Sequence, residues 1–378
     1  MTELTGRIVT PEGVVDGVLA VDGERIVAIT PAQVPDDAPW LVPGFVDIHC
    51  HGGGGHTFTT GDAESARAAA TFHAAHGTTT LHASLVSSPQ PLMLAAARAF
   101  APLVADGVIA GIHCEGPYLA EACRGAQNAA YLRDPSLVEI GELLDAAGPG
   151  VIGMMTIAPE RVGALDAIRL VTDHGVVAAL GHSDATYEQV KAGIAAGATV
   201  GTHVFNGMKP PHHRTPGPVY ALLGAADVVC EFIADGVHLA DGTIEFALAS
   251  VGAARAALIT DAIAAAGMSD GDYELGGQPV RVSAGVARLT GPEASIAGST
   301  LTMDAAFRRV ARVTGSMITA AMAASTTPAR ALGLADRGSL APGLRADIVT
   351  LSRELAVTSI LRGGLRVEAL DSGVGPAA

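Results

Sequence analysis

The segment that decides the fold runs from Pro43 to Gly52 and reads PGFVDIHCHG. It predicts a short buried strand over residues 45–48 that ends in two histidines one residue apart. Side chains at positions i and i+2 of an extended chain point the same way, so His49 and His51 aim at one point. Glycines follow and leave room there. Two imidazoles at the carboxyl end of a strand form half of a site for a divalent metal.

Apolar runs of strand length recur along the chain, and most are separated by alanine-rich stretches of helical length. The strands are expected at residues 45–49, 78–83, 108–113, 151–156, 176–180, 199–202, 228–233 and 257–260. The helices are expected at residues 63–76, 89–104, 137–147, 159–174, 187–196 and 241–251. This alternation predicts an α/β fold with a closed (β/α)8 TIM-type barrel. A doubly wound open sheet is the alternative, which the lack of a GxGxxG motif after the first strand disfavours.

The two ends of the chain contain short β-like runs between turn signals. These runs cover residues 7–10, 17–21 and 25–29, and then 346–351, 357–361 and 365–369. We predict that residues 1–42 and 340–378 form one small β-sandwich domain, and that residues 43–339 form the barrel. A β-hairpin at about residues 272–290 is expected as an insertion after the eighth barrel strand.

Composition restricts the class of protein. Of the 378 residues, 49% are apolar and 16% are charged, which predicts a well-buried globular protein. The formal net charge is −15 and no basic run is present, so nucleic acid and anionic membranes are not expected partners. We expect no signal peptide, because the N-terminus lacks an apolar core segment, and no membrane span, because no apolar run is long enough.

The four cysteines show no CxxC spacing, so we expect reduced thiols in a cytoplasmic protein. Cys50 and Cys114 are expected to be small core side chains. Cys123 falls in a predicted loop, where it could be exposed and reactive.

Metal-competent side chains recur where the predicted barrel strands end. They are His49, His51, Glu115, His182, His203 and Asp261. In a parallel barrel these ends meet on one face, so the six residues can bind one or two divalent ions. Asp261, at the end of the eighth strand, is the expected general base. His113 precedes Glu115 on the same strand face and could support a ligand through a hydrogen bond.

Several sequence blocks resemble the amidohydrolase superfamily and, within it, the N-acetylglucosamine-6-phosphate deacetylase family. They are PGFVDIHCHGGGG (43–55), HCEGPYL (113–119), GHSDA (181–185), THVFNGM (202–208), ADGVH (234–238), TDAIAAAG (260–267), AGSTLTM (297–303) and TTPARALGL…GSLAPGLRADIVTL (326–351). The HxH motif marks only the superfamily. The combination of HxEGP, THxFN and DGxH is specific to this deacetylase family.

The resemblance implies hydrolysis of the acetamide of N-acetyl-D-glucosamine 6-phosphate to D-glucosamine 6-phosphate and acetate. This reaction belongs to amino-sugar catabolism and cell-wall recycling. A metal-bound water would attack the carbonyl, with Asp261 as general base and then acid. Neither Lys191 nor Lys209 is placed to bridge two metals, so the resemblance gives that role to Glu115.

The implied ion sites share Glu115. One ion would be held by Glu115, His182 and His203, and a second by His49, His51, Glu115 and Asp261. Zn²⁺ is the expected metal, with Fe²⁺, Mn²⁺ and Co²⁺ as alternatives.

The resemblance also implies a set of substrate contacts. Arg214 is the best candidate for binding the sugar phosphate and would reach across a homodimer interface into the neighbouring active site. The other implied contacts are Ala126, Gln127, Asn206, Gly207, Asp235, His238, Ile296, Ala297 and Gly298. Gln127 departs from the family, in which many members carry a histidine that helps to hold the substrate carbonyl. Glutamine can donate a hydrogen bond but cannot be cationic.

Two other functions remain open. The chain could deacetylate another N-acetylated amino sugar, for which Arg214 and His238 favour a phosphorylated one. It could also be a catalytically inactive barrel that serves as a scaffold, although such a relative would be expected to lose ligands or the base.

Overall fold

The computed structural model describes residues 1–292 and 294–368. Its larger part is a parallel eight-stranded sheet in the order β14-β13-β12-β11-β10-β9-β8-β5. The strands are β5 (Phe45–Cys50), β8 (Thr78–Val86), β9 (Gly111–Glu115), β10 (Ile152–Ile157), β11 (Val177–Leu180), β12 (Val200–Gly201), β13 (Val229–Ile233) and β14 (Ala256–Ile259). Each lies within a few residues of its predicted position. The prediction of eight parallel barrel strands is confirmed, and the open-sheet alternative is wrong.

The two edge strands of this sheet meet and nearly close the barrel. The buried Asp47 on β5 accepts a hydrogen bond from the Thr260 hydroxyl at 2.6 Å, just after β14. The backbone N–H of Asp261 donates to the carbonyl oxygen of His49 at 2.9 Å. The ends of β5 and β14 are thereby held side by side, which brings His49 and Asp261 to the same part of the rim.

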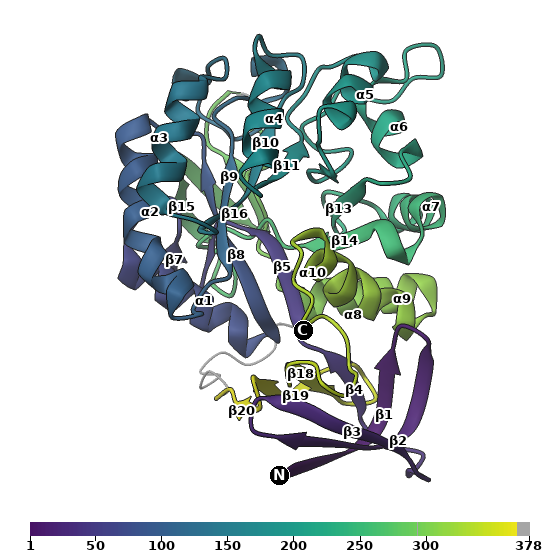
Figure 1. The fold of residues 1–378 in the computed structure, drawn as a ribbon. Coiled ribbons are helices and arrows are strands. Elements are labelled where there is room, and N and C mark those ends of the chain that lie inside the picture. The colour runs from purple at the N-terminus through teal and green to yellow at the C-terminus, as the bar shows by residue number, and fades with distance from the viewer. Residues whose placement is uncertain (293, 369–378) are drawn as a thin grey trace.

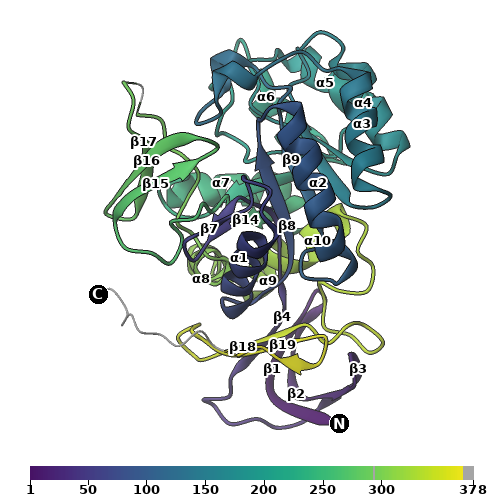
Figure 2. The same ribbon diagram turned by 90° about the vertical axis from the view of Figure 1, so that its left-hand side faces the viewer.

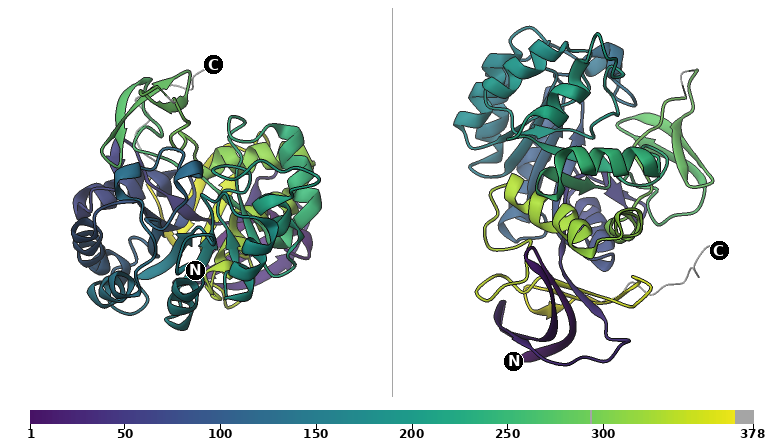
Figure 3. Two further views of the ribbon diagram at one scale, coloured as in Figure 1. Left: turned by 90° about the horizontal axis from the view of Figure 1, so that it is seen from above. Right: turned by 90° about the vertical axis from the view of Figure 1, so that its right-hand side faces the viewer.

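Helices surround the barrel (Figures 1 and 3). The six predicted ones are α1 (Ala63–Ala75), α2 (Gln90–Ala105), α3 (Leu137–Ala147), α4 (Ala164–Asp173), α5 (Tyr187–Ala195) and α7 (Asp241–Val251). Only α4 begins clearly later than expected, because Gly163 has a φ of 84° and cannot belong to the helix. The sequence prediction missed α6 (Gly217–Gly224), α8 (Met303–Thr314), α9 (Met317–Ala321) and α10 (Thr327–Ala331).

Helix α8 packs on the barrel through an apolar stripe. Met303, Ala306, Phe307 and Val310 are buried at the i, i+3, i+4 and i+7 spacing of one helix face. The ring of Phe307 lies 5.3 Å from that of Phe45 on β5. Short 3-10 segments at Glu121–Cys123, Ala129–Tyr131 and Ala253–Arg255 and a π-helical segment at Met322–Thr326 complete the helical structure.

The two ends of the chain form a separate sheet below the barrel in Figure 1. Its order is β20-β19-β18-β4-β1-β2-β3, with the strands β1 (Thr2–Thr10), β2 (Gly13–Asp22), β3 (Arg25–Pro31), β4 (Trp40–Pro43), β18 (Ile348–Leu351), β19 (Val357–Arg362) and β20 (Leu365–Arg366). Strand β4 is parallel to β1 and antiparallel to β18, so the sheet is mixed. The two ends were expected to form a small β-sandwich; in the described residues their strands form one continuous hydrogen-bonded sheet. The domain boundaries at 42/43 and 339/340 stay predictions, and part of the second segment lies outside the described residues.

The insertion after β14 has one strand more than the expected hairpin. Strands β15 (Gly271–Leu275), β16 (Gln278–Ser283) and β17 (Val286–Leu289) form an antiparallel sheet that stands at the side of the barrel (Figure 2). Leu275 and Val280 pack there against Val86 and Ile263 of the barrel. A small two-stranded sheet, β6 (Gly52–Gly53) and β7 (His56–Thr57), follows β5. No helix in the described part of the chain has the length and apolar character needed to cross a bilayer.

Candidate metal centre and active site

The six predicted metal ligands lie together at the carboxyl ends of the barrel strands. His49 is within β5 and Glu115 is the last residue of β9. The other four follow a strand by one or two residues: His51 after β5, His182 after β11, His203 after β12 and Asp261 after β14. All six are buried, with exposed fractions of at most 8%. The sequence prediction that these residues meet at one face is confirmed, whereas their roles as ligands stay a prediction.

Glu115 occupies the centre of the cluster. Its Oε1 lies 3.0 Å from Nε2 of both His182 and His203 and 3.3 Å from Nε2 of His49. Its Oε2 lies 3.2 Å from Nε2 of His51. One carboxylate therefore faces all four imidazoles, as a ligand shared by two ions would.

Asp261 faces the first pair of histidines. Its Oδ1 lies 3.2 Å from Nε2 of His51 and 3.6 Å from Nε2 of His49. These three residues offer donor atoms within 4.8 Å of one another, and so do Glu115, His182 and His203. The two groups match the two predicted ion sites.

Hydrogen bonds on the outer side of each ring fix the tautomers. A carbonyl oxygen can only accept, so Nδ1 of three of the rings carries the proton. These bonds run from His51 to Ser84 at 3.1 Å, from His182 to Cys123 at 2.8 Å and from His203 to Asn206 at 3.1 Å. In His49 the partner of Nδ1 is a carboxylate oxygen of Glu231, at 3.1 Å. Each Nε2 lone pair is left pointing into the cluster, so the donor set fits a divalent metal such as Zn²⁺.

The neighbouring histidines lower the pKa of both carboxylates of the cluster. Burial acts to raise the pKa of Glu115, but the neighbouring His49 and His182 hold it well below its ordinary value. Burial likewise opposes ionisation of Asp261, whereas the hydrogen bond with His51 lowers its pKa.

The backbone is strained at three of the six positions. The φ angles of His182, His203 and Asp261 are 48°, 28° and 50°, a region that residues with a side chain rarely adopt. Such strain persists only where the surrounding structure imposes it, and it gathers at functional sites. The turns after β11, β12 and β14 thus aim these side chains into the cluster at the expense of backbone strain.

A cavity of about 320 Å³ opens above the cluster. Seven of the expected substrate contacts line it: Ala126, Gln127, Asn206, Gly207, His238, Ile296 and Gly298. The structure adds Gly125, Leu275 and Ser295, which the sequence reasoning missed. Ala297 is buried beside the cavity rather than lining it.

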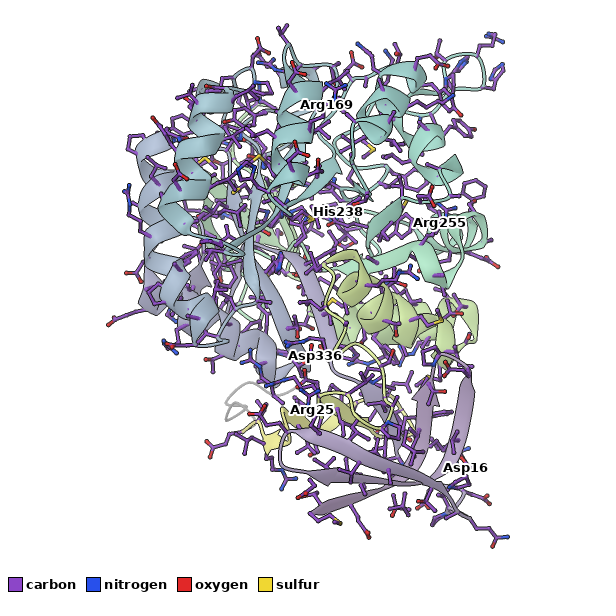
Figure 4. The ribbon with its side chains drawn as sticks, viewed as in Figure 1. Asp16, Arg25, Arg169, His238, Arg255 and Asp336 are labelled. Atoms are coloured by element: carbon purple, nitrogen blue, oxygen red, sulfur yellow. The ribbon has the colours of Figure 1, made fainter. Side chains whose placement is uncertain are left out.

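Asp235 supports His238 from outside the cavity. Its Oδ2 accepts a hydrogen bond from Nδ1 of His238 at 2.7 Å, and its Oδ1 accepts from the backbone N–H of the same residue at 2.8 Å. Burial alone would lower the pKa of His238, but Asp235 raises it above its ordinary value. A histidine with a raised pKa therefore faces the cavity; Figure 4 labels His238 near the middle of the barrel.

Arg214 does not line the cavity. It sits on an exposed loop, where its Nη1 contacts Nε2 of His213 at 2.7 Å. The prediction that it reaches the active site of a neighbouring subunit stays a prediction.

Gln127 contacts the cluster directly. Its Nε2 donates to Oε2 of Glu115 at 2.5 Å, while its Oε1 accepts from the backbone N–H of Ser87 at 2.7 Å. The Ser87 bond fixes which end of the amide faces Glu115. In this structure the donor that was expected to hold a substrate carbonyl is engaged in orienting the central carboxylate.

Cys123 and His113 both lie beside residues of the cluster. The thiol of Cys123 is half-buried rather than fully exposed, and burial raises its pKa to about 11. Its reactivity stays a prediction. His113 was expected to support a ligand. Its ring lies 4.4 Å from that of His49, and its nitrogens bond Ser84 and Thr156 at 2.9 and 2.8 Å.

Comparison with known proteins agrees with this geometry. The model of the amidohydrolase family matches residues 40–367. The N-acetylglucosamine-6-phosphate deacetylase of Lysinibacillus sphaericus is 33% identical over 359 residues, which cover 93% of this chain and 92% of that protein. An N-acetylgalactosamine-6-phosphate deacetylase of Escherichia coli is 36% identical over 366 residues, 94% of this chain and 96% of its own.

A solved structure agrees over the whole fold. It is a mutant N-acetyl-D-glucosamine-6-phosphate deacetylase of Mycobacterium smegmatis in complex with N-acetyl-D-glucosamine-6-phosphate. It is 44% identical with a TM-score of 0.93, covering 97% of this chain and 99% of that one. The chain therefore belongs to the amidohydrolase family and, within it, to the N-acetylglucosamine-6-phosphate deacetylases.

Proposed function

We propose that this protein hydrolyses the acetamide of N-acetyl-D-glucosamine 6-phosphate to D-glucosamine 6-phosphate and acetate. The observation that carries the proposal is the convergence of four imidazoles on Glu115 at the floor of a cavity, in a chain of this family. A relative of 44% identity forms a complex with the same phosphosugar.

The metal is proposed to be Zn²⁺, with Fe²⁺, Mn²⁺ and Co²⁺ as alternatives. Glu115, His182 and His203 would hold one ion, and His49, His51 and Asp261 would share Glu115 to hold a second. A divalent cation supplies Lewis acidity there, which lowers the pKa of water from about 15.7 towards about 7 and polarises an amide carbonyl.

Asp261 is proposed to move the proton. Its carboxylate lines the cavity and the neighbouring His51 lowers its pKa, so an oxygen of this group could accept the proton of the attacking water. The same oxygen then returns that proton to the amine nitrogen as the amide bond breaks. The four histidines have Nδ1 engaged in a hydrogen bond and Nε2 directed at the proposed ions, so they are less suited to this exchange.

The substrate phosphate would be bound by cationic and backbone donors at the cavity rim. His238, whose pKa is raised by Asp235, would bind it within the subunit, and Asn206 and Gly207 line the same opening. The backbone N–H of Asn206 already donates to the carbonyl oxygen of His203, which leaves the backbone N–H of Gly207 and the Asn206 side chain as the proposed donors. We propose that Arg214 completes this site from the second subunit of a homodimer.

We expect His238→Gln to raise KM for the phosphorylated sugar by about 10–100-fold, because hydrogen bonds to charged groups contribute about 1.5–3 kcal/mol. The change in kcat should be smaller, since His238 does not contact the metal cluster. Steady-state kinetics on both sugars test this. A similar rise in KM for unphosphorylated N-acetylglucosamine would contradict a phosphate contact.

We expect Gln127→Ala to lower both metal affinity and kcat, by roughly 10-fold or more, because Glu115 loses a charge-assisted hydrogen bond. Gln90→Ala is the matched control, because Gln90 donates to a backbone carbonyl on α3 and does not line the cavity. Metal content would be measured alongside turnover. A Gln127→Ala variant with full metal content and a raised KM would instead favour direct contact with the substrate carbonyl.

A second substrate has specific support. The relative from Escherichia coli that is 36% identical over nearly its whole length is named for N-acetylgalactosamine 6-phosphate. The two sugars differ in the configuration of one hydroxyl group. None of the residues proposed above is expected to contact that hydroxyl group.

The deciding experiment offers N-acetylglucosamine, its 6-phosphate and N-acetylgalactosamine 6-phosphate side by side, with acetate release as the readout. We expect the glucosamine phosphate to turn over fastest and chelation to abolish activity. Preference for the galactosamine phosphate would move the assignment to that sugar. Metal-loaded protein that turns over none of them would favour the scaffold alternative.

We further propose that the enzyme acts in the cytoplasm, in amino-sugar catabolism and cell-wall recycling. All four cysteines are described and none is paired, which supports a reducing compartment.

A further inference from the structure

One buried carboxylate at the cluster was not among the expected ligands. Glu231 lies in β13, where its neighbours Cys230 and Phe232 are apolar core residues, and its side chain is fully buried. A charged side chain in such a strand needs a partner, because an uncompensated buried charge is strongly destabilising.

Glu231 touches both halves of the cluster with one oxygen. Its Oε2 accepts from Nδ1 of His49 and from the backbone N–H of His203, each at 3.1 Å. His49 belongs to one predicted ion site and His203 to the other. The second oxygen, Oε1, has no hydrogen-bond partner among the described residues.

The acceptor that faces Nδ1 of His49 differs in kind from the acceptors that face the other three rings. Backbone carbonyl oxygens accept from Nδ1 of His51, His182 and His203. A carboxylate makes a hydrogen bond roughly twice as strong as a neutral acceptor does, and it increases the electron density on the opposite nitrogen. Of the four rings, His49 is the one whose Nδ1 faces a carboxylate.

The surroundings of Glu231 give a second observation. Within ion-pair distance, the group that faces Glu231 in the described part of the chain is the imidazole of His49, at 3.1 Å. Glu231 is therefore placed to act on this ring.

We infer that Glu231 is a positioning residue that sets the affinity of the His49, His51 and Asp261 site for the second metal ion. It does so by fixing the His49 tautomer and by increasing the basicity of its Nε2. The inference rests on the proposed metal centre but not on the identity of the substrate.

The test is Glu231→Gln, which keeps the volume and an acceptor oxygen but removes the charge. Metal per subunit would be measured by elemental analysis after dialysis against a series of buffered free-zinc concentrations. We expect the variant to keep one ion and to bind the second about 10–100-fold more weakly than the unmodified protein, the usual effect of losing such a partner. Glu160→Gln is the matched control, since Glu160 bonds Ser183 and Asp184 but no imidazole, and it should keep both affinities.

Two results would overturn the inference. One is a Glu231→Gln variant whose second-ion affinity is unchanged. The other is unmodified protein that never binds more than one ion at saturating zinc. Neither result depends on turnover, so both can be interpreted even if the proposed substrate is wrong.

If Glu231→Gln does not fold, nuclear magnetic resonance of zinc-loaded protein with ¹⁵N-labelled histidine gives an independent answer. We expect Nδ1 of His49 to carry a proton and Nε2 to carry none. An unprotonated Nδ1 would contradict the role of Glu231.

Discussion

Replacing Asp261 with asparagine is expected to lower kcat by about 10²–10⁴-fold, the range that general acid–base catalysis contributes. Asparagine has nearly the same shape and can stay beside His51, but its amide cannot take a proton from water and return it to the leaving amine. KM should change little, because the donors around His238 are untouched. Initial rates and metal content, measured on the same preparation, check the result.

The control for this variant is Asp184→Asn. Asp184 also follows a proposed ligand, His182, at the end of a strand, but it is half exposed, pairs with Lys209 at 3.4 Å and does not line the cavity. We expect it to keep nearly full activity. An Asp261→Asn enzyme that retains its metal and its full kcat would show that another group moves the proton.

The barrel and its cluster could be predicted because their signals are local. Each barrel strand is an apolar run, and five of the strands carry an expected ligand at or just after their carboxyl end. The position of His182 or His203 in the sequence therefore already gives its place on the rim. Parallel pairing then brings these ends together without further information. Helix α8 carries an equally local signal in its stripe of buried residues from Met303 to Val310, but the sequence prediction did not use it.

Other features depend on contacts between distant segments. Leu275 and Ser295 reach the cavity only because the β15–β17 insertion packs on Val86 and Ile263, which no local pattern indicates. Whether Gln127 faces Glu115 or the substrate depends on Ser87, 40 residues away. A hint did exist for Glu231, since a single charge within the apolar run of β13 is unusual. Its partner His49, however, lies 182 residues earlier in the chain.

Replacing Glu115 with glutamine is expected to have the most far-reaching effect on the metal centre. All four imidazoles face this carboxylate within 3.3 Å, so no other residue of the cluster can take its place. Removing one partner of a buried charge pair costs about 3–5 kcal/mol, which corresponds to at least about 10² in affinity. We therefore expect Glu115→Gln to lose both ions at zinc concentrations that saturate the unmodified protein, and to lose activity with them.

Thermal unfolding gives a readout that needs no substrate. A ligand at 100 times its Kd stabilises the folded state by about 2.7 kcal/mol, so zinc should raise the melting temperature of the unmodified protein. Glu115→Gln should show no such rise under the same conditions, whereas Glu160→Gln should match the unmodified protein. Comparison with Glu231→Gln then distinguishes two roles. A variant that loses both ions has lost a ligand shared by the two sites, whereas a variant that loses one ion has lost a residue that serves a single site. If Glu115→Gln also kept one ion, the two sites would not share this carboxylate, and the centre would consist of two independent sites on one rim.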